Sequence, residues 1–194
     1  MTAGMKKTDE QLYQLMKKGN SQAFAELYER REPALYRFAL HMTGSASSAE
    51  EVAQEVFVQL MAPNTRFDES RGSLEGWMYG VARNLVRVQR RKAGSPAPLT
   101  KNGTPQNEPA FEDDILGGMI DGETLAALKI AVTELPPAYR EAVVLCDLEE
   151  RNYDEAARLV GCPVGTIRSR LHRARGLLAA KLKRLNAPLY AGAR

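Results

Sequence analysis

The stretch Gly165-Thr-Ile-Arg-Ser-Arg-Leu-His-Arg-Ala-Arg175 decides how the rest of the chain is interpreted. Successive residues of an α-helix are rotated by about 100°, so apolar residues three or four apart share one face. The apolar residues of this stretch and its continuation keep that spacing: Ile167, Leu171, Ala174 and Leu178. The spacing predicts a helix over about 164–185, with this face packed against a core.

The opposite face of the same helix is polar and basic. It holds Ser169, His172 and Arg173, with Arg168 at its edge. Arginine can bond O6 and N7 of guanine in a bidentate way, while serine and imidazole donate or accept more loosely. Arg170 and Arg175 flank the apolar face and are better placed for phosphates. These residues favour a DNA-reading helix, although a basic amphipathic helix can also be solvated or bind a membrane or an acidic partner.

The residues before this helix favour the DNA-binding interpretation. Residues 153–160 are helical in pattern and carry small side chains at Ala156, Ala157 and Val160, which allow close helix packing. Gly161-Cys162-Pro163 then forms a short turn. Two helices joined by such a turn predict a helix-turn-helix.

The N-terminal half also shows only helical periodicity. Short amphipathic helices are predicted around Leu12, Phe24 and Leu35, and a further helix ends near Pro63. From Leu74 onward, one face is predicted to be apolar and the other basic. The apolar residues are Trp77, Met78, Val81, Leu85 and Val88, and the basic ones are Arg83, Arg87, Arg90 and Arg91.

Residues 93–109 separate the two helical halves. They are rich in Pro, Gly, Ser, Thr and Asn and have no periodicity, which predicts a flexible linker. We therefore expect an all-α protein with two small helical domains, over residues 1–92 and 121–194, joined by a flexible linker over 93–120.

Charge is segregated along the 194 residues, although the net charge is only +3. No acidic residue follows Glu155, whereas nine basic residues do. Residues 106–155 carry thirteen acidic residues against Lys129, Arg140 and Arg151. The basic C-terminal end therefore predicts a polyanionic partner.

Several other classes of protein have little support. No apolar run approaches the roughly 18 residues of a membrane span, and residues 1–20 have no signal-peptide core, so a cytoplasmic chain without membrane insertion is expected. His41 and His172 are the only histidines and lie in no catalytic motif, so no catalytic residue, metal or cofactor is predicted. Metal binding by Cys146, Cys162 and His172 remains a weaker alternative.

The second half of the chain resembles a known family. Leu135-Pro-Pro-Ala-Tyr-Arg-Glu-Ala-Val-Val-Leu145, Tyr153-Asp-Glu-Ala-Ala157 and the opening stretch are similar to region 4 of sigma-70 superfamily members of the extracytoplasmic-function (ECF) type. In that family the helix-turn-helix contacts the minus-35 promoter element. The resemblance implies minus-35 contacts by Thr166, Arg168, Ser169, Arg170, His172, Arg173 and Arg175.

The first half resembles sigma region 2. Ala49-Glu-Glu-Val-Ala-Gln-Glu-Val-Phe57 lies where the family docks on core RNA polymerase, which assigns that role to Glu50, Glu51, Gln54 and Glu55. Trp77-Met-Tyr-Gly-Val-Ala-Arg-Asn84 lies where the family engages the minus-10 element, and residues 64–73 match the loop that holds a flipped base. The implied minus-10 contacts are Phe67, Asp68, Arg83, Asn84, Arg87, Arg90 and Arg91.

The resemblance implies an alternative sigma factor that binds bacterial core RNA polymerase and promoter DNA and initiates transcription. An anti-sigma factor is a further partner expected from the family. The alternative is an ordinary helix-turn-helix regulator, whose N-terminal half would be a ligand-binding or partner-binding module and which would bind duplex DNA without polymerase.

Overall fold

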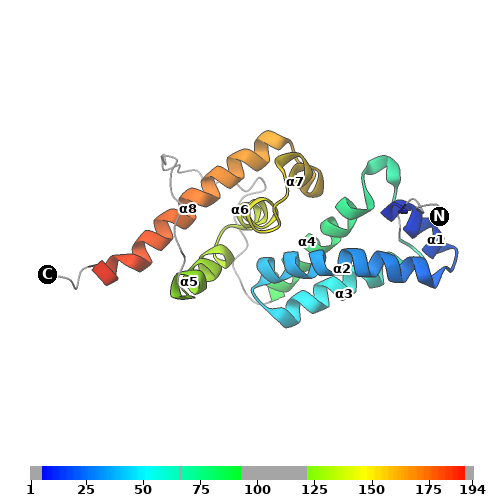
Figure 1. The fold of residues 1–194 in the computed structure, drawn as a ribbon, viewed down its shortest axis with the longest axis horizontal. Coiled ribbons are helices and arrows are strands. Elements are labelled where there is room, and N and C mark those ends of the chain that lie inside the picture. Colours follow the sequence, from blue (N-terminus) through cyan, green and yellow to red (C-terminus); the bar gives the residue numbers. More distant parts are fainter. Residues whose placement is uncertain (1–5, 66, 93–121, 191–194) are drawn as a thin grey trace, which may run out of the picture.

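A computed structural model describes residues 6–65, 67–92 and 122–190, and every regular element within these ranges is helical (Figure 1). The first helical set contains α1 (Asp9–Lys17), α2 (Ser21–Thr43), α3 (Ala46–Met61), the 3₁₀ turn η1 (Glu69–Arg71) and α4 (Leu74–Lys92). The second set contains α5 (Gly122–Thr133), α6 (Pro137–Val143), the π-helical turn η2 (Val144–Leu148), α7 (Tyr153–Val160) and α8 (Val164–Tyr190). The expected linker, residues 93–120, lies outside the described residues. The helical class predicted from the sequence is confirmed.

Polar side chains at the helix starts fix the ends of the first set. Thr8, Asn20 and Ser45 each accept a hydrogen bond from a backbone N–H in the first turn of the helix that follows. Such caps satisfy amide groups that have no partner within the helix. The sequence predicted several short helices, but residues 21–43 form one continuous helix that contains Pro33.

The buried face of α4 differs from the predicted one. Its fully buried residues are Leu74, Met78, Tyr79, Ala82 and Val86. Trp77, Val81 and Leu85 are only partly buried against the same core. The prediction was right for Met78 but missed Tyr79, Ala82 and Val86. α4 contacts α2, α3 and α7, so its buried residues extend beyond a single apolar stripe.

The second set is built around the inner face of α8. Ile167, Leu171, Ala174 and Leu178 are all buried, as the helical spacing predicted. α7 begins with a capping box between Asn152 and Glu155, and it ends at Gly161, whose φ of 72° places it in the left-handed region. This cap and this glycine position α7 against α8 as the first helix of a helix-turn-helix.

The two helical sets pack against each other, with α6 and α7 beside α2 and α4 (Figure 1). One apolar cluster contains buried residues from both sets, including Tyr79 of α4 and Leu159 of α7. Arg140 of α6 is 2% exposed, and its Nη1 donates a 2.6 Å hydrogen bond to the backbone oxygen of Met42 in α2. Burial lowers the Arg140 pKa to about 10, which still leaves its guanidinium charged near neutral pH.

No helix within the described ranges combines the length and the apolar character that a membrane span requires.

Candidate nucleic-acid interface

The outer face of α8 presents polar side chains for binding. Arg168, Ser169 and His172 are exposed, whereas Thr166, Arg170 and Arg173 are half-buried. The guanidinium carbon of Arg168 lies 5.5 Å from the ring centroid of Tyr153, the first residue of α7. This cation–π contact holds a predicted base-reading side chain beside the neighbouring helix. Tyr153 is a residue that the sequence analysis did not select.

Arg175 is also exposed, but it already has an anionic partner within the second set. Its Nη2 and Nε donate to the carboxylate of Asp147 at 2.7 and 3.3 Å. The hydrogen bond and the charge of Asp147 raise the Arg175 pKa. A phosphate contact by Arg175, as predicted, would therefore compete with its ion pair to Asp147 in η2.

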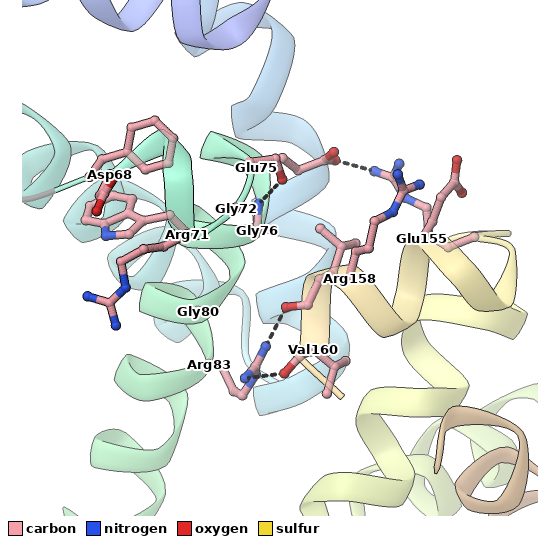
Figure 2. A pocket seen from close by; sticks show the side chains of 16 residues that line it. Asp68, Arg71, Gly72, Glu75, Gly76, Gly80, Arg83, Glu155, Arg158 and Val160 are labelled. Carbon is pink, nitrogen blue, oxygen red and sulfur yellow. Dashed lines mark hydrogen bonds and ion pairs between the residues drawn. The ribbon is translucent and has the colours of Figure 1, made fainter. Parts of the chain in front are cut away.

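The basic side of α4 is divided between exposed and engaged residues. Asn84, Arg87 and Arg91 are exposed and Arg90 is half-buried. Arg83 faces the second helical set: Figure 2 shows its guanidinium aimed at the end of α7. The structure thus places five of the seven predicted minus-10 residues on α4, with Arg83 among them already occupied, whereas Phe67 and Asp68 lie in the preceding loop.

The loop before α4 forms one wall of a cleft. Phe67 packs edge-on against Tyr13, with ring centroids 5.5 Å apart. Asp68 is exposed and accepts hydrogen bonds from the hydroxyl and backbone N–H of Ser70, which lower its pKa. A cleft of about 900 Å³ runs from these residues past Trp77 to the end of α7 (Figure 2).

The predicted polymerase-binding residues lie along α3. Glu50, Glu51 and Gln54 are exposed. Glu55 is half-buried and accepts a 3.0 Å hydrogen bond from Gln59. Thus three of the four predicted side chains form the outer acidic and polar face of the helix.

Two exposed apolar residues extend that face toward the end of α3. Val58 is 52% exposed and Met61 is 50% exposed. They follow Gln54 at spacings of four and seven residues, which places all three on one side of the helix. The sequence analysis missed Val58 and Met61, although their helical spacing from Gln54 places them on the predicted polymerase-binding face.

The metal-binding alternative gains no support. Within the described ranges, no group of three or more His, Cys, Asp or Glu side chains is arranged to hold a metal ion. Cys146 and Cys162 are free thiols. Burial raises the pKa of Cys146 to about 11 and also raises that of Cys162, so neither thiol is activated as a thiolate ligand.

A helix-turn-helix with a basic outer face, packed beside a second helical set with its own basic helix, defines a DNA-binding protein. Comparison with protein-family models identifies both sets. Residues 27–95 match sigma-70 region 2, and residues 125–178 match sigma-70, region 4.

Individual relatives agree with these matches. The chain is 31% identical over 170 residues to the ECF RNA polymerase sigma factor SigC of Mycobacterium tuberculosis, covering 84% of this chain and 85% of that protein. It is 32% identical over 158 residues to the ECF RNA polymerase sigma factor SigE of Mycolicibacterium smegmatis, covering 77% of this chain and 58% of that protein.

A solved structure shows the same fold. It is the sigma factor RpoE in complex with the anti-sigma factor NepR from Bartonella quintana, which is 29% identical, with a TM-score of 0.57 over 82% of this chain and 96% of that one.

This chain belongs to the ECF group of the sigma-70 family. It is accordingly a transcription initiation factor that acts with RNA polymerase at promoters. The match over residues 27–95 decides against an ordinary helix-turn-helix regulator, which has no need of a sigma region 2.

Proposed function

We propose that three surfaces divide the work of initiation in this chain. The outer face of α3 binds core RNA polymerase, α4 and its preceding loop bind the minus-10 element, and α8 reads the minus-35 element. The division follows the proposed domains, with residues 1–92 forming the first and residues 121–194 the second. The observation that carries the proposal is the pairing of a buried apolar face with an exposed, base-competent face on α8.

The minus-35 surface rests on the chemistry of its exposed side chains. Arg168 is able to donate two hydrogen bonds to one guanine, and Ser169 and His172 offer single donors or acceptors. The Oγ of Ser169 donates a 3.0 Å hydrogen bond to the Thr166 backbone oxygen, so its hydroxyl oxygen is able to accept a bond from a base. Arg170 and Arg173 are proposed as further contacts, for the groove or its phosphates.

The minus-10 surface joins a cleft to a basic helix. Unstacking a base costs a few kcal/mol, which contacts in a pocket must offset. Phe67 and Asp68 offer an apolar surface and a hydrogen-bond acceptor at the cleft wall. Asn84, Arg87, Arg90 and Arg91 are proposed to follow the strand and its phosphates, with Arg83 joining them once it is released from α7.

The polymerase surface combines charge with exposed apolar area. Glu50, Glu51 and Gln54 give specificity, and Val58 and Met61 add the apolar contact that a stable interface needs at its centre. Glu55 is proposed to support this face through its bond to Gln59.

This surface is tested by measuring binding of the full chain to bacterial core RNA polymerase. Glu50→Arg and Val58→Asp should each weaken binding, because they reverse a charge and place a charge in an apolar contact. Glu29→Arg is the matched control, since Glu29 is an exposed carboxylate on α2 outside this face. Equal binding by all three variants and wild type would refute the α3 assignment.

An anti-sigma factor is the further partner that we propose, because the solved relative is held by one. We assign the chain no catalytic step and no cofactor, since its proposed surfaces are binding surfaces. A factor that acts on bacterial RNA polymerase would work in the cytoplasm.

A further inference from the structure

One side of α1 faces the stretch between α3 and α4, which carries the proposed base pocket. α1 lies beside the start of α4 (Figure 1). Its residues on that side are three or four positions apart, which places them on one face of the helix. These residues, the α1 stripe, are Glu10, Tyr13, Gln14 and Lys17, and their respective partners are Leu74, Phe67, Glu69 and Ala62. The stripe thus contacts both ends and the middle of the stretch.

A charged contact of the stripe lies at the first residue of α4. Glu10 accepts a 3.0 Å hydrogen bond from the backbone N–H of Leu74, which is fully buried. The first N–H groups of a helix have no partner within it and attract negative charge, so a carboxylate there holds the helix start in place. Burial acts to raise the Glu10 pKa, but hydrogen bonds, chiefly the one from Leu74, bring the pKa below its ordinary value. The carboxylate is therefore ionised near neutral pH.

Two further contacts hold the residues on either side of Asp68. Tyr13 is 4% exposed, and its ring meets that of Phe67 at an interplanar angle of 89°. Such an edge-to-face pair fixes the orientation of both rings. The Nε2 of Gln14 donates a 3.3 Å hydrogen bond to Glu69, the first residue of η1. The stripe therefore supports the proposed pocket directly at its wall.

α1 is itself fixed to the rest of the first helical set. Asp9 is 6% exposed and pairs with two arginines of α2, with Arg30 at 2.8 Å and also with Arg31. Arg31 continues to the carboxylate of Glu75 in the first turn of α4, at 2.5 Å. Leu12 is 1% exposed in the core. Contacts from a helix held in this way transmit its position to the stretch.

The stretch has little packing of its own. Residues 68–73 are all exposed. Asp68 accepts a 3.0 Å hydrogen bond from the N–H of Ser70. Ser73 accepts one of 3.1 Å from the N–H of Gly76. These bonds shape the turn locally, but a segment with few buried contacts opens easily unless other elements hold it.

We infer that α1 is a positioning element for base selection at the minus-10 element, with Glu10 and Tyr13 acting through Phe67 and Asp68. The inference rests on the proposed function, which assigns those two pocket residues to a flipped base. A displaced pocket loses contacts that depend on close geometry, whereas the polymerase and minus-35 surfaces lie on α3 and α8 and keep theirs. The match to sigma-70 region 2 begins at residue 27 and does not include α1.

Transcription by the full chain with core RNA polymerase, from a promoter library randomised across the minus-10 element, tests the inference. Asp68→Ala identifies the position that the pocket reads. At that position Glu10→Ala should reduce the preference for the favoured base by about fivefold, as expected for the loss of one hydrogen bond that supports the pocket. Glu10→Gln retains an oxygen that accepts from Leu74 and should restore the preference. Glu29→Ala, at an exposed carboxylate of α2, is the control and should match wild type.

Two readouts distinguish positioning from a loss of stability. Core binding and minus-35 selectivity should stay at wild-type values for Glu10→Ala, and the fluorescence of 2-aminopurine at the selected position, which rises when the base unstacks, should be lower than with wild type. Gln14→Ala removes an exposed contact of the stripe without disturbing the core, so it keeps the test valid if Glu10→Ala does not fold. It should lower the same preference by about twofold.

The outcomes separate this inference from the proposed function. A changed preference with Asp68→Ala but not with Glu10→Ala or Gln14→Ala would refute the role of α1 alone. An equal loss with Glu10→Ala at every promoter position would also refute it, because that result indicates general destabilisation. An unchanged preference with Asp68→Ala and Phe67→Ala would refute the minus-10 assignment of the pocket, and the role of α1 would fall with it.

Discussion

Replacing Tyr153 should weaken minus-35 recognition through its effect on Arg168. Tyr153 is 37% exposed, so its cation–π contact with Arg168 falls at the exposed end of the range, about 0.5–1 kcal/mol. Tyr153→Leu should therefore reduce affinity for a minus-35 duplex by about two- to fivefold. Tyr153→Phe keeps an aromatic face and should remain close to wild type.

The assay is fluorescence anisotropy with a labelled minus-35 duplex, arranged as a double-mutant cycle. Arg168→Ala should cost about 1–3 kcal/mol if this arginine bonds a guanine in a bidentate way. Once Arg168 is absent, Tyr153→Leu should add almost nothing, because its proposed role is to position that side chain. An equal loss from Tyr153→Leu in both backgrounds would refute the positioning role.

Three further predictions concern the second helical set and His41 of α2. Asp147→Asn should free Arg175. If the arginine then binds a phosphate, the slope of log binding constant against log salt concentration should steepen by about 0.9. Glu134→Gln, which alters the ion pair with Lys181, is the control, and equal slopes for the two variants would exclude the new contact. Asn152→Ala should lower the free energy of unfolding by about 0.5–2 kcal/mol in a denaturant titration, because it removes the N-cap of α7, and an unchanged midpoint would contradict that role. Burial lowers the His41 pKa below its ordinary 6.5, so the unfolded chain binds the proton more tightly than the folded chain. The free energy of unfolding should therefore fall as the pH drops below 6.5. His41→Gln should flatten this dependence in thermal melts at several pH values, and an unchanged pH dependence would rule His41 out as its source.

Helical periodicity predicted the buried face of α8 well, although that face contributes to two apolar clusters: Ile167 belongs to one, and Leu171, Ala174 and Leu178 belong to the other. Ile167, Leu171 and Ala174 are all buried where the spacing placed them. The same reasoning failed for α4, where Val86 is buried while Val81 and Leu85 are only partly so. A helix with neighbours on two sides has apolar residues on both, so periodicity alone does not identify its inner face.

The occupied state of Arg83 could not be predicted from the sequence. Two of its acceptors are backbone oxygens, which every residue has and no sequence motif marks. Its ionic partner, Glu141, lies 58 positions away in a different helical set. The residue type correctly suggested an anion-binding side chain, but only the packing of α4 against α7 shows what it contacts.

The central claim is tested most directly by in vitro transcription with bacterial core RNA polymerase and a promoter library. Wild type should direct initiation at defined promoters, Glu50→Arg should lose activity through weaker core binding, and Arg173→Ala should keep core binding but lose minus-35 selectivity. Duplex binding by the chain alone, with no polymerase-dependent initiation at any promoter, would contradict the account.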